Sequence, residues 1–157
     1  MVVAGGGAAG FFAAITCAEA APGTEVVLLE RGPQFLSKVR ISGGGRCNVT
    51  HACFDARELA AHFPRGEQAL IGPFQRFHPR DTIEWFERRG VKLKTESDGR
   101  MFPVTDSSQT IMDCLLRAAK DAGVKLVTGC GVQGVRRLTG FELKLSNGET
   151  LSCDRLL

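Results

Sequence analysis

The chain has 157 residues, of which 43% are hydrophobic and 24% are charged, and its net charge is +3. This balance is typical of a single globular domain, and no stretch approaches the roughly 18 uninterrupted apolar residues of a membrane span. The basic residues are spread along the chain, and the densest stretch, residues 76–80, is flanked by acidic side chains, which argues against nucleic acid as a partner. Because no signal peptide is recognisable, we expect a cytoplasmic protein with reduced cysteines. We also expect a small-molecule substrate and no membrane partner.

The first predicted elements are a strand and a helix on either side of a glycine motif. An apolar stretch at residues 1–4 precedes the G-x-G-x-x-G of Gly5, Gly7 and Gly10, and a small-residue helix is expected over residues 11–21. The first glycine permits a tight turn, the second lets the backbone approach a pyrophosphate, and the third lets the helix pack on the strand. The free N–H groups at the start of such a helix favour an anion.

A second strand follows at residues 25–30 and ends in an acidic residue, Glu30, twenty positions after Gly10. In this order of elements the carboxylate is placed to accept hydrogen bonds from an adenosine ribose. The sequence therefore predicts a dinucleotide site rather than an ordinary glycine turn. A connection rich in glycine and basic residues is expected over residues 34–53.

The middle of the chain shows helical and then alternating patterns. We predict a helix over residues 56–63 and another over residues 82–89, with Asp81 as the N-cap of the second. Alternating apolar residues predict a strand over residues 91–95, and residues 100–104 are its expected hairpin partner.

The longest predicted helix is capped by Asp106 or Ser107 and extends to about residue 122. A short apolar strand is expected after it, over residues 124–127. The apolar side chains of the helix recur at helical spacing and predict its inner face: Ile111, Leu115, Ala118, Ala119 and Ala122.

The last third of the chain predicts a meander of strands over residues 132–138, 141–146 and 150–157, with an Asn-Gly hairpin turn between the last two. Together with the parallel βαβ opening, this predicts an α/β, Rossmann-like FAD-binding fold with a parallel sheet and an antiparallel three-stranded meander. The chain stops on an apolar strand. We therefore expect residues 1–157 to be the N-terminal part of a truncated FAD-binding domain, without its C-terminal segment or a second domain.

A second glycine motif, Ser-Gly-Gly-Gly-Arg-Cys-Asn, occupies residues 42–48. Consecutive glycines expose backbone N–H groups and let the chain lie against a flat or anionic ligand. Arg46 can offer a forked cation to a phosphate or a flavin edge, and Asn48 can donate and accept hydrogen bonds. A flexible solvent loop is the alternative interpretation of this stretch.

Two cysteines and a histidine lie close together after this motif, and they raise two further hypotheses. The spacing of Cys47, His51 and Cys53 fits no common zinc site, and no fourth ligand is evident unless His62 folds back, so we expect no metal. A catalytic disulfide between the two cysteines is a second, less favoured hypothesis, because nothing in the sequence indicates a lowered thiol pKa.

Three segments of the chain, residues 5–10, 38–50 and 99–105, resemble the YhiN/BaiN-type flavoproteins. Members are also described as aminoacetone oxidase family FAD-binding enzymes or NAD(P)/FAD-dependent oxidoreductases. The resemblance covers essentially the whole chain and implies FAD as cofactor and NAD(P)H as electron donor. Family members are longer and carry a further domain and a C-terminal glycine-rich segment. We therefore expect the isolated chain to hold FAD weakly and to be incomplete as an enzyme.

The resemblance also implies which residues bind the cofactor. The first glycine motif would hold the pyrophosphate, Glu30 the adenosine ribose, and the backbone of Val132 the adenine. The flavin half would lie along Lys38 and residues 46–48. The expected binding residues are Gly5, Gly7, Ala8, Ala9, Gly10, Glu30, Arg31, Lys38, Gly44, Gly45, Arg46, Cys47, Asn48 and Val132.

The implied reaction passes a hydride through N5 of FAD, between a reduced nicotinamide and an activated C=C bond or a similar small organic substrate. A flavin-dependent oxidase of a small amine and a non-catalytic dinucleotide-binding module are the alternatives. An NAD-dependent dehydrogenase would leave the second glycine motif unexplained. No side chain is assigned as general acid or base, since His51 and His78 are candidates by residue type only.

Overall fold

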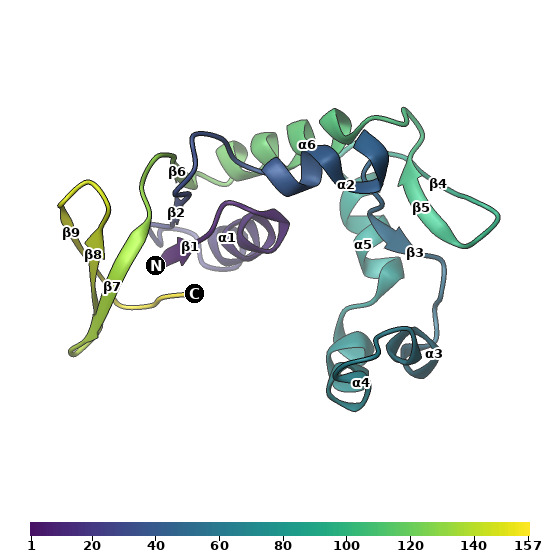
Figure 1. Cartoon of the computed structure of the whole chain (residues 1–157), viewed down its shortest axis with the longest axis horizontal. Helices are drawn as coiled ribbons and strands as arrows, with labels where there is room; N and C mark the ends of the chain where they lie inside the picture. Colours follow the sequence, from purple (N-terminus) through teal and green to yellow (C-terminus); the bar gives the residue numbers. More distant parts are fainter. The chain divides into compact units, whose positions relative to one another are not determined.

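The computed structural model describes residues 1–157 (Figure 1). The chain forms two compact units. Residues 1–39 and 115–157 make the first unit, and residues 40–114 make the second. None of the helices is long and apolar enough to cross a membrane.

The first unit contains a parallel sheet in the order β1-β2-β6, formed by β1 (Val2–Ala4), β2 (Val27–Leu29) and β6 (Lys125–Val127). Helix α1 (Ala8–Ala20) connects β1 to β2 (Figure 1). The predicted βαβ unit is therefore confirmed, although its helix begins three residues earlier than expected. The central strand β2 is entirely buried, as parallel strands are when both faces are covered.

The predicted meander follows as β7 (Val132–Arg137), β8 (Phe141–Leu145) and β9 (Thr150–Cys153), which pair antiparallel in that order. Gly148 has φ +87° in the turn between β8 and β9, a conformation that glycine adopts at little cost. Apolar side chains of the parallel sheet and of the meander share one core: Val2, Val27, Leu29, Cys130, Leu143 and Leu145. The predicted Rossmann-like α/β fold is confirmed.

Residues 155–157 lie beside β1 on the edge opposite β2. The Val2 amide donates to the Arg155 carbonyl at 2.9 Å, and the Leu157 amide donates to the Val2 carbonyl at 3.0 Å. Leu156 forms a parallel bridge with Val2, so this segment extends the parallel sheet beyond its three named strands.

The second unit is built around an antiparallel sheet in the order β3-β5-β4. Its buried apolar residues include Phe102, Met101, Phe86 and Val91, and α5 packs against β3 and β4. The remaining elements in chain order are α2 (Ser37–Gly45), β3 (Thr50–His51), α3 (Ala56–Ala61), α4 (Glu67–Arg76), α5 (Pro79–Glu87), β4 (Leu93–Thr95), β5 (Arg100–Pro103) and α6 (Ser108–Asp121), of which α2 and α6 each have residues in both units.

Helix α6 buries the face that its sequence predicts. Ile111, Leu115, Ala118 and Ala119 are buried, and Ala122, just beyond the helix, is half-buried. Of the two predicted caps, Ser107 supplies the bond, since its Oγ accepts from the Gln109 amide at 3.3 Å.

Three expectations for the middle of the chain were wrong. The connection at residues 34–53 contains α2 and β3, which the triple glycine obscures. Helix α4 was not predicted, because Pro73 lies inside it and it buries no residue fully. The N-cap of α5 is His78, and Asp81 lies inside the helix, where its carboxylate accepts from the His78 amide at 2.8 Å in a capping box.

Candidate dinucleotide site

The first glycine turn links β1 to α1 through a close backbone approach. Gly5 has φ +123°, and its amide donates to the Leu29 carbonyl at 2.8 Å. A Cβ atom built on Gly10 would lie 1.9 Å from the Gly5 carbonyl oxygen, which no side chain tolerates. The third glycine of the motif is therefore needed for the helix to pack against the turn, as the sequence predicts.

The start of α1 is open to a ligand. Gly7 is its N-cap, and a Cβ atom built there meets nothing within 4 Å. Gly7, Ala8 and Ala9 are all exposed, and no side chain caps the helix. The first N–H groups of a helix have no partner inside the helix, so this end can bind an anion.

Glu30 braces the turn from the end of β2. Its Oε2 accepts from the Gly6 amide at 2.9 Å, and its Oε1 accepts from the Gly32 amide at 2.7 Å. Each carboxylate oxygen keeps a further lone pair, so Glu30 can still accept a hydrogen bond from a ribose hydroxyl. The sequence analysis gave Gly6 no role, but a Cβ atom there would lie 2.4 Å from Cδ1 of Phe35.

A hollow of about 250 Å³ opens beside this turn, at the carboxyl ends of β1 and β2. It is lined by Ala4, Gly5, Leu29, Glu30, Arg31, Cys130, Gly131 and Val132. Four of the predicted binding residues thus surround one pocket of the first unit: Gly5, Glu30, Arg31 and Val132. In Rossmann-type sheets, ligands bind beyond the carboxyl ends of the strands.

Four lining residues were not among the predicted binding residues: Ala4, Leu29, Cys130 and Gly131. The Cys130 amide donates to the Glu30 carbonyl at 2.9 Å, and the Gly131 amide donates to Ser146 Oγ at 2.9 Å. A Cβ atom on Gly131 would lie 2.8 Å from Cβ of Arg31. The Gly-Cys-Gly sequence at residues 129–131, between β6 and β7, was the signal that could have revealed Cys130 and Gly131. Lys38, the remaining predicted residue of this unit, lies exposed on α2.

The second glycine loop belongs to the second unit. Helical dihedral angles end at Ser42, and Gly43, Gly44 and Gly45 have φ values of +56°, +68° and +85°. A Cβ atom on Gly43 would lie 2.8 Å from the Asn48 amide nitrogen, whereas Gly44 and Gly45 face open space. The loop therefore needs glycine for its backbone conformation throughout and for close packing at one end.

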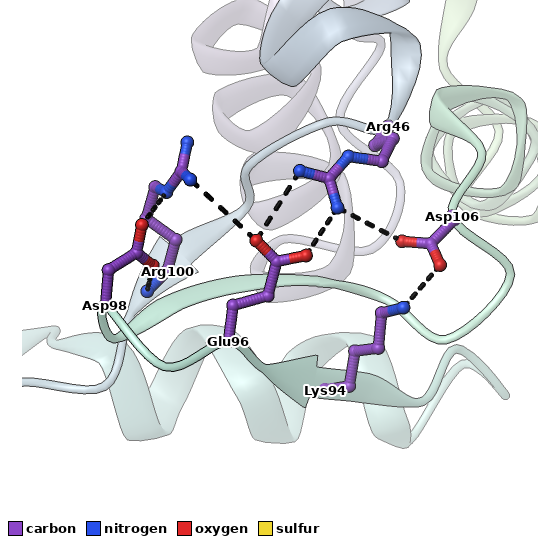
Figure 2. Close-up of polar contacts among 6 residues, drawn as sticks. All are labelled: Arg46, Lys94, Glu96, Asp98, Arg100 and Asp106. Atoms are coloured by element: carbon purple, nitrogen blue, oxygen red, sulfur yellow. Dashed lines mark hydrogen bonds and ion pairs between the residues drawn. The ribbon is translucent and has the colours of Figure 1, made fainter.

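Arg46, at the end of this loop, is surrounded by partners (Figure 2). Its Nη1 donates to Oε1 of Glu96, and its Nη2 lies 3.5 Å from the other carboxylate oxygen. Nη1 also lies 3.5 Å from Oδ1 of Asp106, and the guanidinium stands 4.0 Å from the centre of the Phe102 ring. The hydrogen bond to Glu96 is the main reason that the pKa of Arg46 is raised.

The ion pairs continue on both sides of Arg46 (Figure 2). Lys94 binds Asp106, Arg100 Nη2 lies 3.8 Å from Oε2 of Glu96, and Arg100 Nε donates to Asp98 at 2.7 Å. Three cations thus alternate with three carboxylates, so the network as a whole is neutral. Arg46 was predicted as a forked cation for a ligand, and its fork instead meets two carboxylates of the protein.

The cysteines and histidine after the loop are separately engaged. Cys47 has φ +62°. Burial raises the pKa of its thiol, so the thiol stays protonated at neutral pH. His51 Nε2 lies 3.0 Å from the Asp98 carbonyl oxygen, while Cys53 Sγ contacts the Asp55 carbonyl at 3.8 Å. All six cysteines are free, and no three His, Cys, Asp or Glu side chains are grouped to hold a metal.

The βαβ unit, its glycine turn and the pocket at the strand ends define a Rossmann-type domain. The chain belongs to the family described as the HI0933-like protein Rossmann domain, whose model matches residues 1–157. The family resemblance seen in the sequence is confirmed.

Two characterised relatives match nearly the whole chain. The 3-dehydro-bile acid delta(4,6)-reductase of Clostridium scindens is 27% identical over 156 residues, which are 99% of this chain and 37% of the relative. The ribosomal RNA dihydrouridine synthase of Escherichia coli is 31% identical over 157 residues, which are 99% of this chain and 38% of the relative. The chain therefore spans well under half the length of these relatives.

Solved structures share the fold at low sequence identity. Glycine oxidase from Geobacillus kaustophilus has a TM-score of 0.59 and 16% identity, with 99% of this chain and 53% of that chain covered. THI4 of Thermovibrio ammonificans also has a TM-score of 0.59 and is 14% identical, with 92% of this chain and 46% of that chain covered. At these identities the likeness shows the fold alone.

Proposed function

We propose that the chain is the FAD-binding part of an oxidoreductase. The observation that carries the proposal is the joint geometry of the first unit: an open helix N-terminus at Gly7, a carboxylate at Glu30, and a pocket that reaches Val132. A pyrophosphate fits the helix start, and a ribose and an adenine fit the pocket beside it. FAD would supply hydride transfer through its N5 atom, and the chain's own residues bind and orient it.

The proposed substrate carries a C=C bond activated by a neighbouring carbonyl group, with NAD(P)H as the electron donor. The names of the two relatives support this class. A 3-dehydro-bile acid with delta(4,6) unsaturation is a conjugated ketone, and dihydrouridine is uridine whose ring C=C bond has been reduced. Both names describe addition of hydrogen to a double bond conjugated to a carbonyl group.

We favour a small-molecule enone over a nucleic acid and over a membrane-bound substrate. The charges support this choice, because the net charge is only +3 and Arg46, Lys94 and Arg100 are paired with carboxylates. A uracil ring in RNA is the second candidate, which the 31% identity to the dihydrouridine synthase favours. We also propose a cytoplasmic location, since six free cysteines fit a reducing compartment.

The test begins with the absorption spectrum of the purified natural protein, in which we expect bound flavin. Oxidation of NADH and NADPH is then followed with a steroid enone, with uridine-containing RNA and with glycine under oxygen. Enone-dependent oxidation supports the small-molecule proposal, and RNA-dependent oxidation supports the second candidate. Glycine-dependent oxygen consumption without either reductase activity would identify an amine oxidase, and a colourless protein would leave a non-catalytic binding module.

A further inference from the structure

Arg46 and Glu96 join the second glycine loop to the hairpin of β4 and β5. We propose that Arg46 clamps this loop and that Glu96 is a positioning residue acting through it, so that the loop presents backbone N–H groups to a ligand. The ligand, on the proposed function, is the flavin half of FAD. The role of Arg46 is then to hold the loop in place, and it is not the cation that contacts the cofactor.

The surroundings of Arg46 engage one face of its guanidinium and its Nη1 atom, while the side chain keeps 34% of its surface exposed. One face lies on the Phe102 ring, and its Nη atoms meet Glu96 and Asp106. The six-residue network contains as many carboxylates as cations, so its charges cancel within the protein. An anion that approached Arg46 would meet a cation whose charge Glu96 and Asp106 already compensate.

The glycine loop is costly to order, although the Cys47 amide closes it by donating to the Ser42 carbonyl at 3.0 Å. Gly43, Gly44 and Gly45 all have positive φ, and glycine loses more conformational freedom on ordering than any other residue. Within the turn, the Arg46 amide lies 3.4 Å from the Gly43 carbonyl, a long hydrogen bond. Fixing the Arg46 side chain to another strand holds the end of the loop in place.

Phe102 makes the clamp effective because it contacts both ends of the loop. A Cβ atom on Gly43 would lie 2.9 Å from Cε1 of Phe102, and the Arg46 guanidinium lies over the same ring. Phe102 lies in β5 and is fully buried. Between these two fixed ends, Gly44 and Gly45 keep an open face, which is the part of the loop free to meet a ligand.

The first measurement tests the clamp without any cofactor. Hydrogen exchange of the Cys47 amide, which closes the loop by donating to the Ser42 carbonyl at 3.0 Å, is measured in flavin-free natural protein, in wild type and in the variants Glu96→Gln and Glu84→Gln. Glu84 pairs with Arg88 on α5 of the same unit and is the matched control. We expect Glu96→Gln alone to accelerate exchange about tenfold. Equal exchange in the two variants, or none faster than wild type, would overturn the clamp.

The second measurement tests the effect on the ligand. We expect Glu96→Gln to raise the dissociation constant of FAD about tenfold and to change it little further in an Arg46→Met background, because Glu96 acts through Arg46. Unchanged affinity, or the same loss in both backgrounds, would overturn the positioning role. If wild type binds no FAD, the proposed function fails, while the exchange measurement still decides the clamp.

Discussion

The two glycine loops use the same residue for different physical reasons. In the first, Gly6 and Gly10 have no room for a side chain, and only Gly5 has a positive φ. In the second, three consecutive glycines have positive φ, and only Gly43 lacks room. Crowding therefore shapes the first loop, and backbone conformation shapes the second.

The loops also differ in how the protein holds them. The first is held by a carboxylate that bonds to backbone amides, through Glu30, and by the helix packed on it. The second is held by a side-chain ion pair between Arg46 and Glu96. Because the Arg46 and Glu96 side chains are partly exposed, salt in the solvent weakens the ion pair that holds the second loop.

The largest expected effect is the loss of flavin on changing Gly7 to valine. The Cβ atom of the added side chain has no protein atom within 4 Å, but the side chain occupies the space proposed for the pyrophosphate. We expect a folded, colourless natural protein, checked by its absorption spectrum and melting temperature. Stoichiometric yellow cofactor in this variant would contradict the proposed pyrophosphate site.

Changing Gly10 to alanine should destabilise the first unit by about 3 kcal/mol or more, as severe overpacking does. The cause is the 1.9 Å approach to the Gly5 carbonyl, which outweighs the better helix propensity of alanine. Denaturant unfolding measures the change, and Gly7→Ala is the control, expected within about 0.5 kcal/mol of wild type. Equal stability of the two variants would show that crowding does not shape this loop.

Replacing Glu30 by alanine should cost about 1–3 kcal/mol, since the Gly6 and Gly32 amides lose their acceptor. The same change should weaken discrimination against a ribose 2′-phosphate at this site, because the carboxylate repels that group. Denaturant unfolding and competition by NADP against FAD test the two effects. Glu25→Ala, at an exposed position, is the control. If the wild type bound NADP tightly and Glu30→Ala lost this binding, the sign of the prediction would be wrong.

In the second loop, alanine at Gly44 should cost about 1 kcal/mol for its positive φ alone. Alanine at Gly43 should cost more, because a Cβ atom there also lies 2.8 Å from the Asn48 amide nitrogen. Melting temperatures of the two variants rank the effects. The reverse order would show that the close approach of Gly43 to Asn48 adds no cost to its positive φ.

The smallest expected effect is that of pH on the ion network of the second unit. The hydrogen bond from Lys94 lowers the pKa of Asp106, and the backbone amide of Arg100 lowers the pKa of Asp98, both below the usual 3.8. A carboxyl group with a lowered folded pKa stabilises the fold above pH 3.8 and loses this contribution as the pH falls through the folded value. The denaturant concentration at the unfolding midpoint should therefore decrease slightly as the pH is lowered below 4. This decrease should be smaller in Asp106→Asn.

Local patterns made much of the fold predictable. The βαβ unit, the β4–β5 hairpin and the meander follow from alternation, helical spacing and turn residues within a few positions. Helix α4 was missed because Pro73 interrupts the pattern, and the cap of α5 was misplaced because histidine is an uncommon N-cap.

The site was predictable only in part. Gly5, Glu30, Arg31 and Val132 were predicted and line one pocket. The partners of Arg46 lie 50 and 60 positions away in the sequence, and no spacing rule connects them. Contacts of this kind depend on the register of β4 against β5, which only the folded chain establishes.

The pairing of residues 155–157 with β1 has a consequence for the order of folding. Strand β1 is bonded on one side to β2, about 25 residues later, and on the other to residues 155–157, which are translated long after it. Contacts of such long sequence separation form slowly, because closing the intervening chain costs entropy before any contact repays it. We therefore expect the βαβ segment to wait with two unpaired strand edges, because β2 also pairs with the later strand β6, and chaperones or premature aggregation would act there.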